Sequence, residues 1–310
     1  RGGVGAKGSD TRDEDFIEYI YPASMHNYML FFTQKGRCYW LKVYDIPEGS
    51  KNSKGRAIQN MLNIDSDDKV NAFIRCKNLT DPEYNSTHNL IFCTKNGIIK
   101  KTKLEAYSRP RVNGVNAIII REDDQVVEVR LTDGDSEVLW ANKSGYAIRF
   151  HESTVREMGR MSTGVKGMTL SEGDEVVGMI CMPKGTENTV MVVSEQGYGK
   201  RSDLEDYRIT NRGGKGVKTM NLTDKTGNLI GLEAVTDDQD LMLITKSGTA
   251  IRMAMDTIRV MGRATQGVKL IELQKRNDTL MFGCTVPKEE TEDVVENTDA
   301  ATEDNQNNVE

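Results

Sequence analysis

The sequence predicts an all-β protein, a propeller-like ring of six four-stranded blades with the first blade incomplete at its N-terminus. Three observations support this prediction. A turn glycine, then a basic residue, then a second glycine about nineteen residues on recur with a period near fifty residues. Each repeat reads as four short runs of alternating apolar residues separated by turn dipeptides. The aromatic content of 6% and hydrophobic content of 37% suit many short, half-exposed strands.

The period is visible in the positions of the glycines. The first glycines are Gly36, Gly97, Gly145, Gly197 and Gly248. The second glycines are Gly55, Gly114, Gly164, Gly216 and Gly267. The intervals between successive second glycines are 59, 50, 52 and 51 residues. A copy of this size is too small to bury a core alone, so neighbouring copies must share their core in one domain, which we assign to residues 1–287.

The first two copies open the chain. Residues 1–30 read as the second half of a copy, because the run RGGVGAKG stands where later copies have their second glycine. The first half of that copy is missing, which is why the first blade is expected to be incomplete. The second copy predicts a hairpin within 26–46, turning at Gly36, and two further strands at 60–64 and 70–76.

Four more copies follow the same plan. An insertion at 76–88 accounts for the one long interval. The predicted hairpins and closing strands are 89–107 with 126–131, 137–150 with 176–182, 189–202 with 229–235, and 241–253 with 280–286. Short helical turns are expected near 205–209 and 255–260, and no long helix. A closed ring is favoured over an open β-solenoid because closure hides the edge strands.

Charge is distributed unevenly along the chain. The net charge is -6, but residues 288–310 alone hold nine acidic residues and one basic residue. The remaining body has 40 basic and 38 acidic residues and is close to neutral. The acidic tail has no aromatic residue and few apolar ones, so we expect 288–310 to be disordered. A mobile acidic segment beside a basic ring could compete with a polyanion for the same residues.

Basic residues recur at four shared offsets from the first glycine. Offset four carries Lys101, Arg149, Arg201 and Arg252, with Trp40 in the second copy. In the last three copies, offset eleven carries Arg156, Arg208 and Arg259, offset fifteen Arg160, Arg212 and Arg263, and offset twenty-one Lys166, Lys218 and Lys269. Equivalent positions of a ring point to equivalent places, so this pattern predicts a basic stripe around one rim or the outer edge.

A basic stripe on a near-neutral body indicates a protein that binds a polyanion. Loops rich in Gly, Arg and Lys contact phosphates without specifying bases, and no recognition helix is predicted, so the expected binding is independent of base sequence. The other candidate DNA-binding residues are Arg1, Gly2, Gly3, Lys7, Arg37, Lys42, Lys51, Lys54, Arg56, Lys100, Arg109, Arg111, Lys200 and Lys215. The alternative for any one of them is a solvated loop charge.

Other chemistries find little support in the sequence. The five cysteines have no CxxC pair or zinc-type spacing and read as buried thiols. The motif GxxxxGK[ST] is absent, and His26, His88 and His151 are scattered without a partnered nucleophile. No apolar run of eighteen residues and no signal peptide are visible. We therefore expect no catalytic residue, no metal site, no bound cofactor and no membrane contact.

The repeats resemble a known family. The RGG…KG element, the GVK-type second glycines, the six copies and the acidic tail are similar to the C-terminal domain of the DNA gyrase A protein, over residues 1 to about 287. The family's box, QRRGGKG, is matched here by Arg1, Gly2 and Gly3 and then departs as VGAKG. The run NRGGKG at 211–216 is closer in letters but stands in another blade, so we interpret it as a repeat echo.

This resemblance implies a β-pinwheel that wraps double-stranded DNA with positive handedness and lets the parent type IIA topoisomerase introduce negative supercoils using ATP. It implies a monomeric, non-catalytic piece of a larger protein in the bacterial cytoplasm, at the nucleoid. Its partners would be the rest of the gyrase A protein and the gyrase B protein in a heterotetramer, with ATP and Mg²⁺ bound elsewhere in that complex. Two alternatives stay open: the corresponding domain of topoisomerase IV, holding DNA without strong wrapping, and a propeller scaffold that binds proteins.

Overall fold

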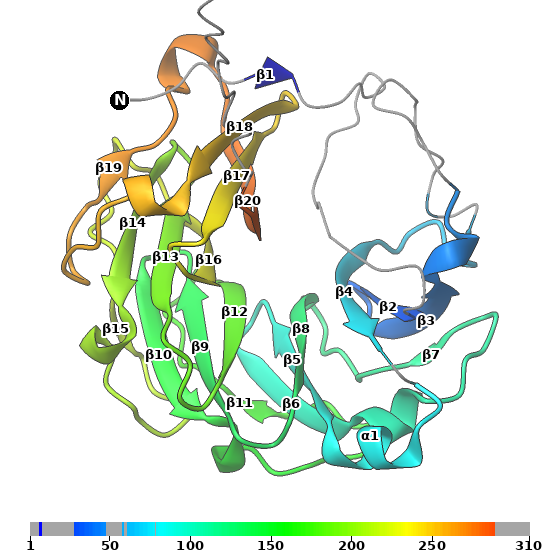
Figure 1. Cartoon of the computed structure of the whole chain (residues 1–310). Coiled ribbons are helices and arrows are strands. Elements are labelled where there is room, and N and C mark those ends of the chain that lie inside the picture. Colours follow the sequence, from blue (N-terminus) through cyan, green and yellow to red (C-terminus); the bar gives the residue numbers. More distant parts are fainter. Residues whose placement is uncertain (1–5, 8–27, 48–57, 59–60, 78, 289–310) are drawn as a thin grey trace, which may run out of the picture.

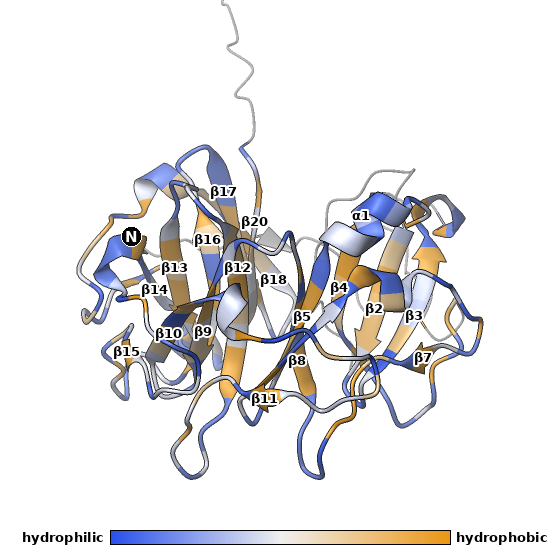
Figure 2. Ribbon diagram, turned by 90° about the horizontal axis from the view of Figure 1, so that it is seen from below, coloured by the Kyte–Doolittle hydropathy of each residue, from blue (hydrophilic) through white to orange (hydrophobic). Residues whose placement is uncertain are grey.

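Five four-stranded antiparallel sheets form the blades of a ring in the computed structural model (Figure 1). The structure describes residues 6–7, 28–47, 58, 61–77 and 79–288. The blades follow one another in chain order, from blue β2 to orange β20 in Figure 1. Figure 2 shows hydrophobic colour along the strands and hydrophilic colour in many of the loops between them. Among the described residues no helix is long and apolar enough to span a membrane.

Two strands of each blade lie nearest the ring axis. The innermost strands are β4 (Val70–Cys76), β8 (Val126–Thr132), β12 (Val176–Pro183), β16 (Leu229–Val235) and β20 (Leu280–Pro287). The second strands are β2 (Tyr28–Thr33), β5 (Asn89–Thr94), β9 (Ser136–Asn142), β13 (Thr189–Ser194) and β17 (Gln239–Thr245). Innermost strands of neighbouring blades contact one another, so they surround the axis of the ring.

The outer half of each blade is made by strands from two different repeats. The third strands are β3 (Arg37–Lys42), β6 (Ile98–Lys103), β10 (Tyr146–His151), β14 (Tyr198–Asp203) and β18 (Thr249–Ala254). The outermost strands are β7 (Val115–Asn116), β11 (Val165–Lys166), β15 (Val217–Lys218), β19 (Val268–Lys269) and β1 (Ala6–Lys7). Strands β7, β11, β15 and β19 each pair with the third strand of the preceding blade. Each repeat therefore completes the blade before it.

The number of described blades is five, and the expected count of six is not confirmed. The prediction treated the first residues as part of an incomplete first blade. Instead Ala6 pairs with Ala250 and Lys7 with Thr249, so β1 is the outermost strand of the last described blade. The same strand exchange that joins the other blades explains this pairing, because residues 6–7 precede the first described repeat. Residues 8–27 lie outside the described part of the chain.

Short helices connect the strands. The 3₁₀ turns are η1 (Val43–Asp45), η3 (Leu104–Tyr107), η4 (Glu152–Thr154), η5 (Leu204–Asp206), η6 (Met255–Thr257) and η7 (Gln274–Arg276). The turns predicted near 205–209 and 255–260 correspond to η5 and η6 and are confirmed. The single α-helix of the described residues, α1 (Pro82–Thr87), lies in the predicted insertion and is capped by the Asp81 carboxylate, which accepts from the Glu83 amide.

Every first hairpin is closed by the same local device. A hydroxyl or amide oxygen three residues before the first glycine accepts a hydrogen bond from the backbone N–H one residue after it. The donor–acceptor pairs are Arg37–Thr33, Ile98–Thr94, Tyr146–Asn142, Tyr198–Ser194 and Thr249–Thr245. This repeated cap explains why the turn dipeptides Lys-Gly, Asn-Gly, Ser-Gly and Gln-Gly fold alike.

The core lies between the blades as well as within them. One hydrophobic cluster joins Leu30 and Phe32 of β2 to Leu90 and Phe92 of β5 and to Tyr107. The Phe32 and Phe92 rings meet edge to face with centroids 5.3 Å apart. Each fully buried aromatic ring contributes roughly 1.5–3 kcal/mol relative to exposure. The sharing of one core by adjacent repeats was predicted and is observed.

The cysteines are free thiols. Cys38, Cys76 and Cys93 are buried, whereas Cys181 and Cys284 on β12 and β20 are half-buried. Burial raises the pKa of the Cys284 thiol to about 11. The prediction of buried thiols is thus right for three of the five and too strong for the two on the innermost strands β12 and β20.

Four of the five first glycines, Gly36, Gly97, Gly145 and Gly197, allow a close approach of the segment that follows the exchanged strand of the next repeat. At Gly145 the backbone has a φ of +91°, and a Cβ there would lie 2.8 Å from the Met220 carbonyl oxygen. The Gly145 carbonyl in turn accepts from the amides of Thr219 (2.8 Å) and Met220 (3.3 Å). A side chain at this position would therefore disturb the attachment of the next repeat, whose exchanged strand β15 completes this blade.

We predict that Gly145→Ala lowers the free energy of unfolding by about 1–3 kcal/mol, through left-handed strain plus this contact. The matched control is Gly185→Ala, because Gly185 has a φ of +81° with open space around its Cβ position. Urea titration followed by circular dichroism measures both. Equal losses in the two variants would contradict a role for the contact between Gly145 and the segment that follows β15.

Candidate nucleic-acid interface

Three of the four basic residues at offset four, Lys101, Arg149 and Arg201, point into the protein, toward the next blade. The side chain of Arg149 on β10 is 6% exposed. Its Nε and Nη2 donate to Glu137 at 2.9 and 2.5 Å, and its Nη1 donates to the carbonyls of Leu204 and Tyr207 at 3.1 and 3.0 Å. Leu204 begins η5, so Arg149 ties β10 to the 3₁₀ turn of the following repeat.

The same contact recurs at the other joints. Lys101 Nζ donates to the Glu152 carbonyl at 3.0 Å, and Arg201 Nη1 donates to the Met255 carbonyl at 3.0 Å. Trp40, which replaces the basic residue in its copy, donates from Nε1 to the Tyr107 carbonyl at 2.9 Å. Offset four therefore carries a hydrogen-bond donor that points inward, and this donor need not be a cation.

Their placement corrects the expectation that these residues form a surface stripe. Lys101, Arg149 and Arg201 are buried, and each has carbonyl or carboxylate partners within the protein. Arg252 is more exposed but bonds to Asp240 and to the Pro287 carbonyl. We assign Lys101, Arg149 and Arg201 a structural role, because their side chains lie on the face of the third strand that meets the next blade. Arg252 is bonded within its own sheet, to Asp240 on β17 and Pro287 on β20.

Lys100 and Lys200 are also buried, with relative exposures of 0%. Lys100 Nζ donates to the carbonyls of Ala117 and Arg160 at 2.5 and 2.7 Å. Lys200 Nζ donates to the Gly262 carbonyl at 2.8 Å and to the Arg263 carbonyl. Burial, with Arg160 and Arg263 nearby, lowers the pKa of Lys100 to about 7 and that of Lys200 to about 8. Both are removed from the candidate DNA-contacting set.

The arginines at offset fifteen are half-buried and hold the exchanged strands. Arg212 donates to the carbonyls of Thr154 (3.1 Å) and Lys166 (2.9 Å). Arg160 donates to the Asn116 carbonyl at 2.7 Å, and Arg263 donates to the Lys218 and Asp206 carbonyls. Each of the three therefore bonds the outermost strand that belongs to the preceding joint. Their guanidinium groups are partly accessible as well, so they stay in the candidate interface.

Another group of predicted residues is exposed. Arg156, Arg208 and Arg259 follow the 3₁₀ turns, and Lys166 and Lys218 lie on the outermost strands β11 and β15. Lys42, Arg109, Arg111 and Lys215 are exposed too. Within the described residues, the structure records no ion pair for any of these nine side chains. The strands β7, β11 and β15 are the edge strands of their sheets and lie toward the outside of the ring in Figure 1, and we call these nine exposed side chains the basic perimeter.

The remaining candidates are either engaged or outside the described residues. Lys269 pairs with Glu272 at 2.9 Å. Arg37 donates to Asn116 Oδ1 and the Asn113 carbonyl at 3.1 and 2.7 Å. Lys7 contributes its backbone to β1. The candidates Arg1, Gly2, Gly3, Lys51, Lys54 and Arg56 lie outside the described part of the chain, so their assignment stays a prediction.

The acidic residues near the first hairpins cap turns. Asp68 Oδ1 accepts from the Lys35 and Lys69 amides, and Asp124 Oδ1 accepts from the Asn96 and Gln125 amides. Asp278 does the same for Ser247 and Thr279. These carboxylates sit just before the innermost strands.

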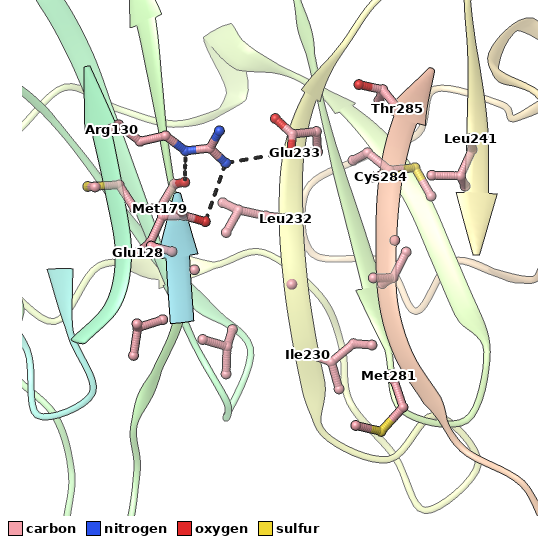
Figure 3. Close-up of a pocket in the computed structure, with 18 of the residues that line it drawn as sticks. Glu128, Arg130, Met179, Ile230, Leu232, Glu233, Leu241, Met281, Cys284 and Thr285 are labelled. Carbon is pink, nitrogen blue, oxygen red and sulfur yellow. Dashed lines mark hydrogen bonds and ion pairs between the residues drawn. The ribbon is translucent and has the colours of Figure 1, made fainter. Parts of the chain in front are cut away.

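The ring encloses a central cavity of about 410 Å³, lined by residues of all five innermost strands. Figure 3 shows Arg130 between Glu128 and Glu233, with its Nη2 3.5 and 3.6 Å from their carboxylates. Arg130 Nε also donates to the Met179 carbonyl at 3.3 Å. Most of the other lining residues are apolar. Within the described part of the chain no group of three or more His, Cys, Asp and Glu side chains is placed to hold a metal ion.

One histidine has a nucleophile-like neighbour that sequence reasoning missed. His151 Nε2 lies 2.8 Å from Asp135 Oδ1, and His151 Nδ1 lies 2.8 Å from Ser153 Oγ. The Ser153 amide also donates to Nδ1, so the imidazole caps η4. The three residues lie at the surface, away from the central cavity, and we interpret them as a turn cap.

Comparison with known proteins agrees with this architecture. The family model described as "DNA gyrase C-terminal domain, beta-propeller" matches residues 27–77, 88–133, 136–181, 188–236 and 239–282. The DNA gyrase A protein of Staphylococcus aureus (strain NCTC 8325 / PS 47) is 43% identical over 293 residues, which are 94% of this chain and 32% of that protein. The chain thus spans about a third of the length of the curated relatives it matches.

Two solved structures are similar over most of their length. The structure of a DNA gyrase A C-terminal domain has a TM-score of 0.80 and 25% identity, covering 92% of this chain and 90% of the other. The crystal structure of the C-terminal domain of a DNA topoisomerase IV has a TM-score of 0.76 and 26% identity, covering 91% and 85%.

The buried role of Arg149 leads to a testable prediction. Arg149→Met should lower the free energy of unfolding by about 3 kcal/mol, because it leaves Glu137 and two carbonyls without their donor. Arg156→Met, at an exposed arginine with no ion pair recorded in the described residues, should change it by less than about 0.5 kcal/mol. Thermal and urea denaturation of both variants compares the two. A larger loss for Arg156→Met would reverse the assignment.

Proposed function

The chain belongs to the DNA gyrase C-terminal domain family of β-propellers, and on that premise we propose that it binds double-stranded DNA independently of base sequence and wraps it around the outer perimeter of the ring. The observation that carries this proposal is the basic perimeter. Arg156, Arg208 and Arg259 occupy equivalent exposed positions in successive repeats, next to the outermost strands that hold Lys166 and Lys218.

The energetics of bending are consistent with such a surface. Bending a short DNA site smoothly by 40–90° costs roughly 1–6 kcal/mol. Phosphate contacts on successive blades can offset this cost through counterion release, and the binding must then weaken steeply with salt. Arginine and lysine side chains on a curved surface, with no element that reads the bases, can contact the DNA backbone. Architectural proteins that bend DNA use such backbone contacts.

Within a parent protein, this module would supply the chiral wrap that lets a gyrase introduce negative supercoils in an ATP-dependent reaction. The chain itself carries no step of that reaction in our proposal. Its partners would be the rest of the gyrase A protein and the gyrase B protein in a heterotetramer in the bacterial cytoplasm, with ATP and Mg²⁺ held elsewhere in the complex. The similarity to the S. aureus DNA gyrase A protein supports this assignment.

The second candidate is a module that holds DNA without strong wrapping. The similarity to a topoisomerase IV C-terminal domain favours it. The departure of the N-terminal run RGGVGAKG from the gyrase box also leaves this candidate open. The two candidates share the basic perimeter and differ in whether DNA follows it around the ring.

A topology assay separates these candidates. A relaxed plasmid is incubated with the 310-residue chain over a range of salt, closed by ligase and resolved on gels. We expect trapped positive writhe that disappears as salt rises. Binding without a change in linking number would favour the second candidate. Absence of binding at low salt would reject both and favour a protein-binding scaffold.

The basic perimeter can be tested by charge reversal. Arg156→Glu, Arg208→Glu and Arg259→Glu combined should weaken DNA binding and reduce the slope of log affinity against log salt by about 0.9 for each phosphate that is no longer neutralised. The charge-matched control combines Lys184→Glu, Lys225→Glu and Lys246→Glu, exposed lysines in loops that are not part of the basic perimeter. Fluorescence anisotropy with a labelled duplex measures the slopes. Equal slopes for the two triple variants would contradict the assigned surface.

A further inference from the structure

Two buried lysines hold the turns that carry the arginines of offset fifteen. Lys100 and Lys200 stand three residues after the first glycine in their repeats, on β6 and β14. Neither ammonium forms an ion pair with a described residue. Both donate instead to backbone carbonyls of a turn in the next repeat.

The two turns have the same construction. In residues 159–162 the Ser162 amide donates to the Gly159 carbonyl at 3.3 Å, and in residues 262–265 the Thr265 amide donates to the Gly262 carbonyl at 3.3 Å. Lys100 Nζ reaches the Arg160 carbonyl, and Lys200 Nζ reaches the Gly262 and Arg263 carbonyls. Each lysine thus binds the backbone of the turn whose arginine side chain lies at the outer perimeter.

A third turn provides an internal comparison. Ile148 on β10 occupies the position of the two lysines, and the turn beside it reads Asn-Arg-Gly-Gly over residues 211–214. A Cβ on Gly214 would lie 3.4 Å from the Ile148 Cδ1. The blade forms there without a buried lysine at this position, which indicates that Lys100 and Lys200 serve the turns and are not required by the fold.

Several polar, aromatic and charged groups surround each lysine. Lys100 faces the Tyr107 hydroxyl at 3.5 Å, the Phe92 ring with its centroid at 5.1 Å, and the charge of Arg160. Lys200 faces Ser202 Oγ at 3.3 Å and the charges of Arg263 and Asp206, with Tyr207 in the same environment. Burial and the neighbouring arginine place the pKa values of Lys100 and Lys200 at about 7 and about 8. A phosphate beside either arginine would offset its repulsion.

We propose that Lys100 and Lys200 are positioning residues for the turns at 159–162 and 262–265, and that binding of DNA phosphates at these turns takes up protons at the two lysines. The inference rests on the proposed DNA-binding function and deepens it. A charged ammonium binds carbonyl oxygens more strongly than a neutral amine, so protonation fixes the turn. A phosphate near the turn favours the charged form, so the two events support each other.

The expected pH dependences of binding and of folding have opposite signs. DNA favours the protonated lysines, so affinity falls as the pH rises through their pKa values, which are about 7 and about 8 in the free protein. Folding lowers both pKa values below that of an unfolded lysine, so the folded protein binds fewer protons and its free energy of unfolding rises over the same window. The titration of these two lysines therefore weakens binding at high pH without destabilising the fold.

The test is calorimetry of the 310-residue chain with a short DNA duplex at about pH 8, in two buffers of different ionisation enthalpy at constant low salt. The difference between the two heats gives the number of protons taken up. Anisotropy titrations from about pH 7 to 9 give the affinity, which should fall about tenfold for each unit by which DNA raises a lysine pKa. The variants are Lys100→Met/Lys200→Met and Lys100→Gln/Lys200→Gln, and the control is Lys184→Met, an exposed lysine outside the basic perimeter.

We expect net proton uptake by the unmodified chain and by Lys184→Met. The Met and Gln double variants should lack the part of the uptake that is due to Lys100 and Lys200. The Gln variant keeps an N–H donor to the turns, so its affinity should exceed that of the Met variant while its pH profile is equally flat. Comparison between variants also removes the contribution of the α-amino group, which titrates in this range. Circular dichroism at each pH verifies folding.

Two results would overturn the inference. If the unmodified chain binds DNA with the same proton uptake as the Met double variant, the lysines are structural only, and the proposed function stands. If the unmodified chain does not bind DNA at low salt and neutral pH, the proposed function fails and the inference fails with it.

Discussion

The joint between successive blades depends on one backbone interaction. The carbonyl of the first glycine of a repeat accepts from two amides that follow the exchanged strand of the next repeat. The shorter bond of each pair is Ala117–Gly36 (2.7 Å), Gly167–Gly97 (2.8 Å), Thr219–Gly145 (2.8 Å) and Leu270–Gly197 (2.8 Å). Each such bond contributes only about 0.5–1.5 kcal/mol, but the close approach it requires restricts these four positions to glycine.

The side chains at offset four reinforce this joint. Once the backbones are locked, the donor at that offset reaches the carbonyls of the next 3₁₀ turn, whether it is Trp40, Lys101, Arg149 or Arg201. The arginines at offset fifteen then hold the outermost strand from the other side. The basic residues that form one repeated pattern in the sequence therefore have two roles. Some are buried and structural, and others are exposed on the perimeter. The basic perimeter is held in place because the donors at offset four bond the next 3₁₀ turn and the arginines at offset fifteen bond the outermost strand.

The sequence predicted much of the fold and part of the site. The glycine period, the hairpin alternation and the short helical turns are observed at the expected places. The expected surface stripe was only partly right, because a shared offset shows that positions are equivalent without showing which way they point. Arg149 stands between Ile148 and Phe150, and Lys200 next to Gly199, and such neighbours could have suggested a buried environment. The number of blades could not be predicted from these local patterns, because the first strand, β1, pairs with β18 near the other end of the chain.

The sequence by itself determined that the chain is a ring-like repeat of four-stranded units with basic residues at shared positions. It could do so because turn glycines, alternation and spacing are local properties of the chain. Only the tertiary structure decided which basic residues are exposed, because their exposure depends on the contact of each third strand with the following blade. It also decided that residues 6–7 complete the last described blade, and that Lys100 and Lys200 are buried under turns. These are contacts between segments far apart in the chain, and no local pattern encodes them.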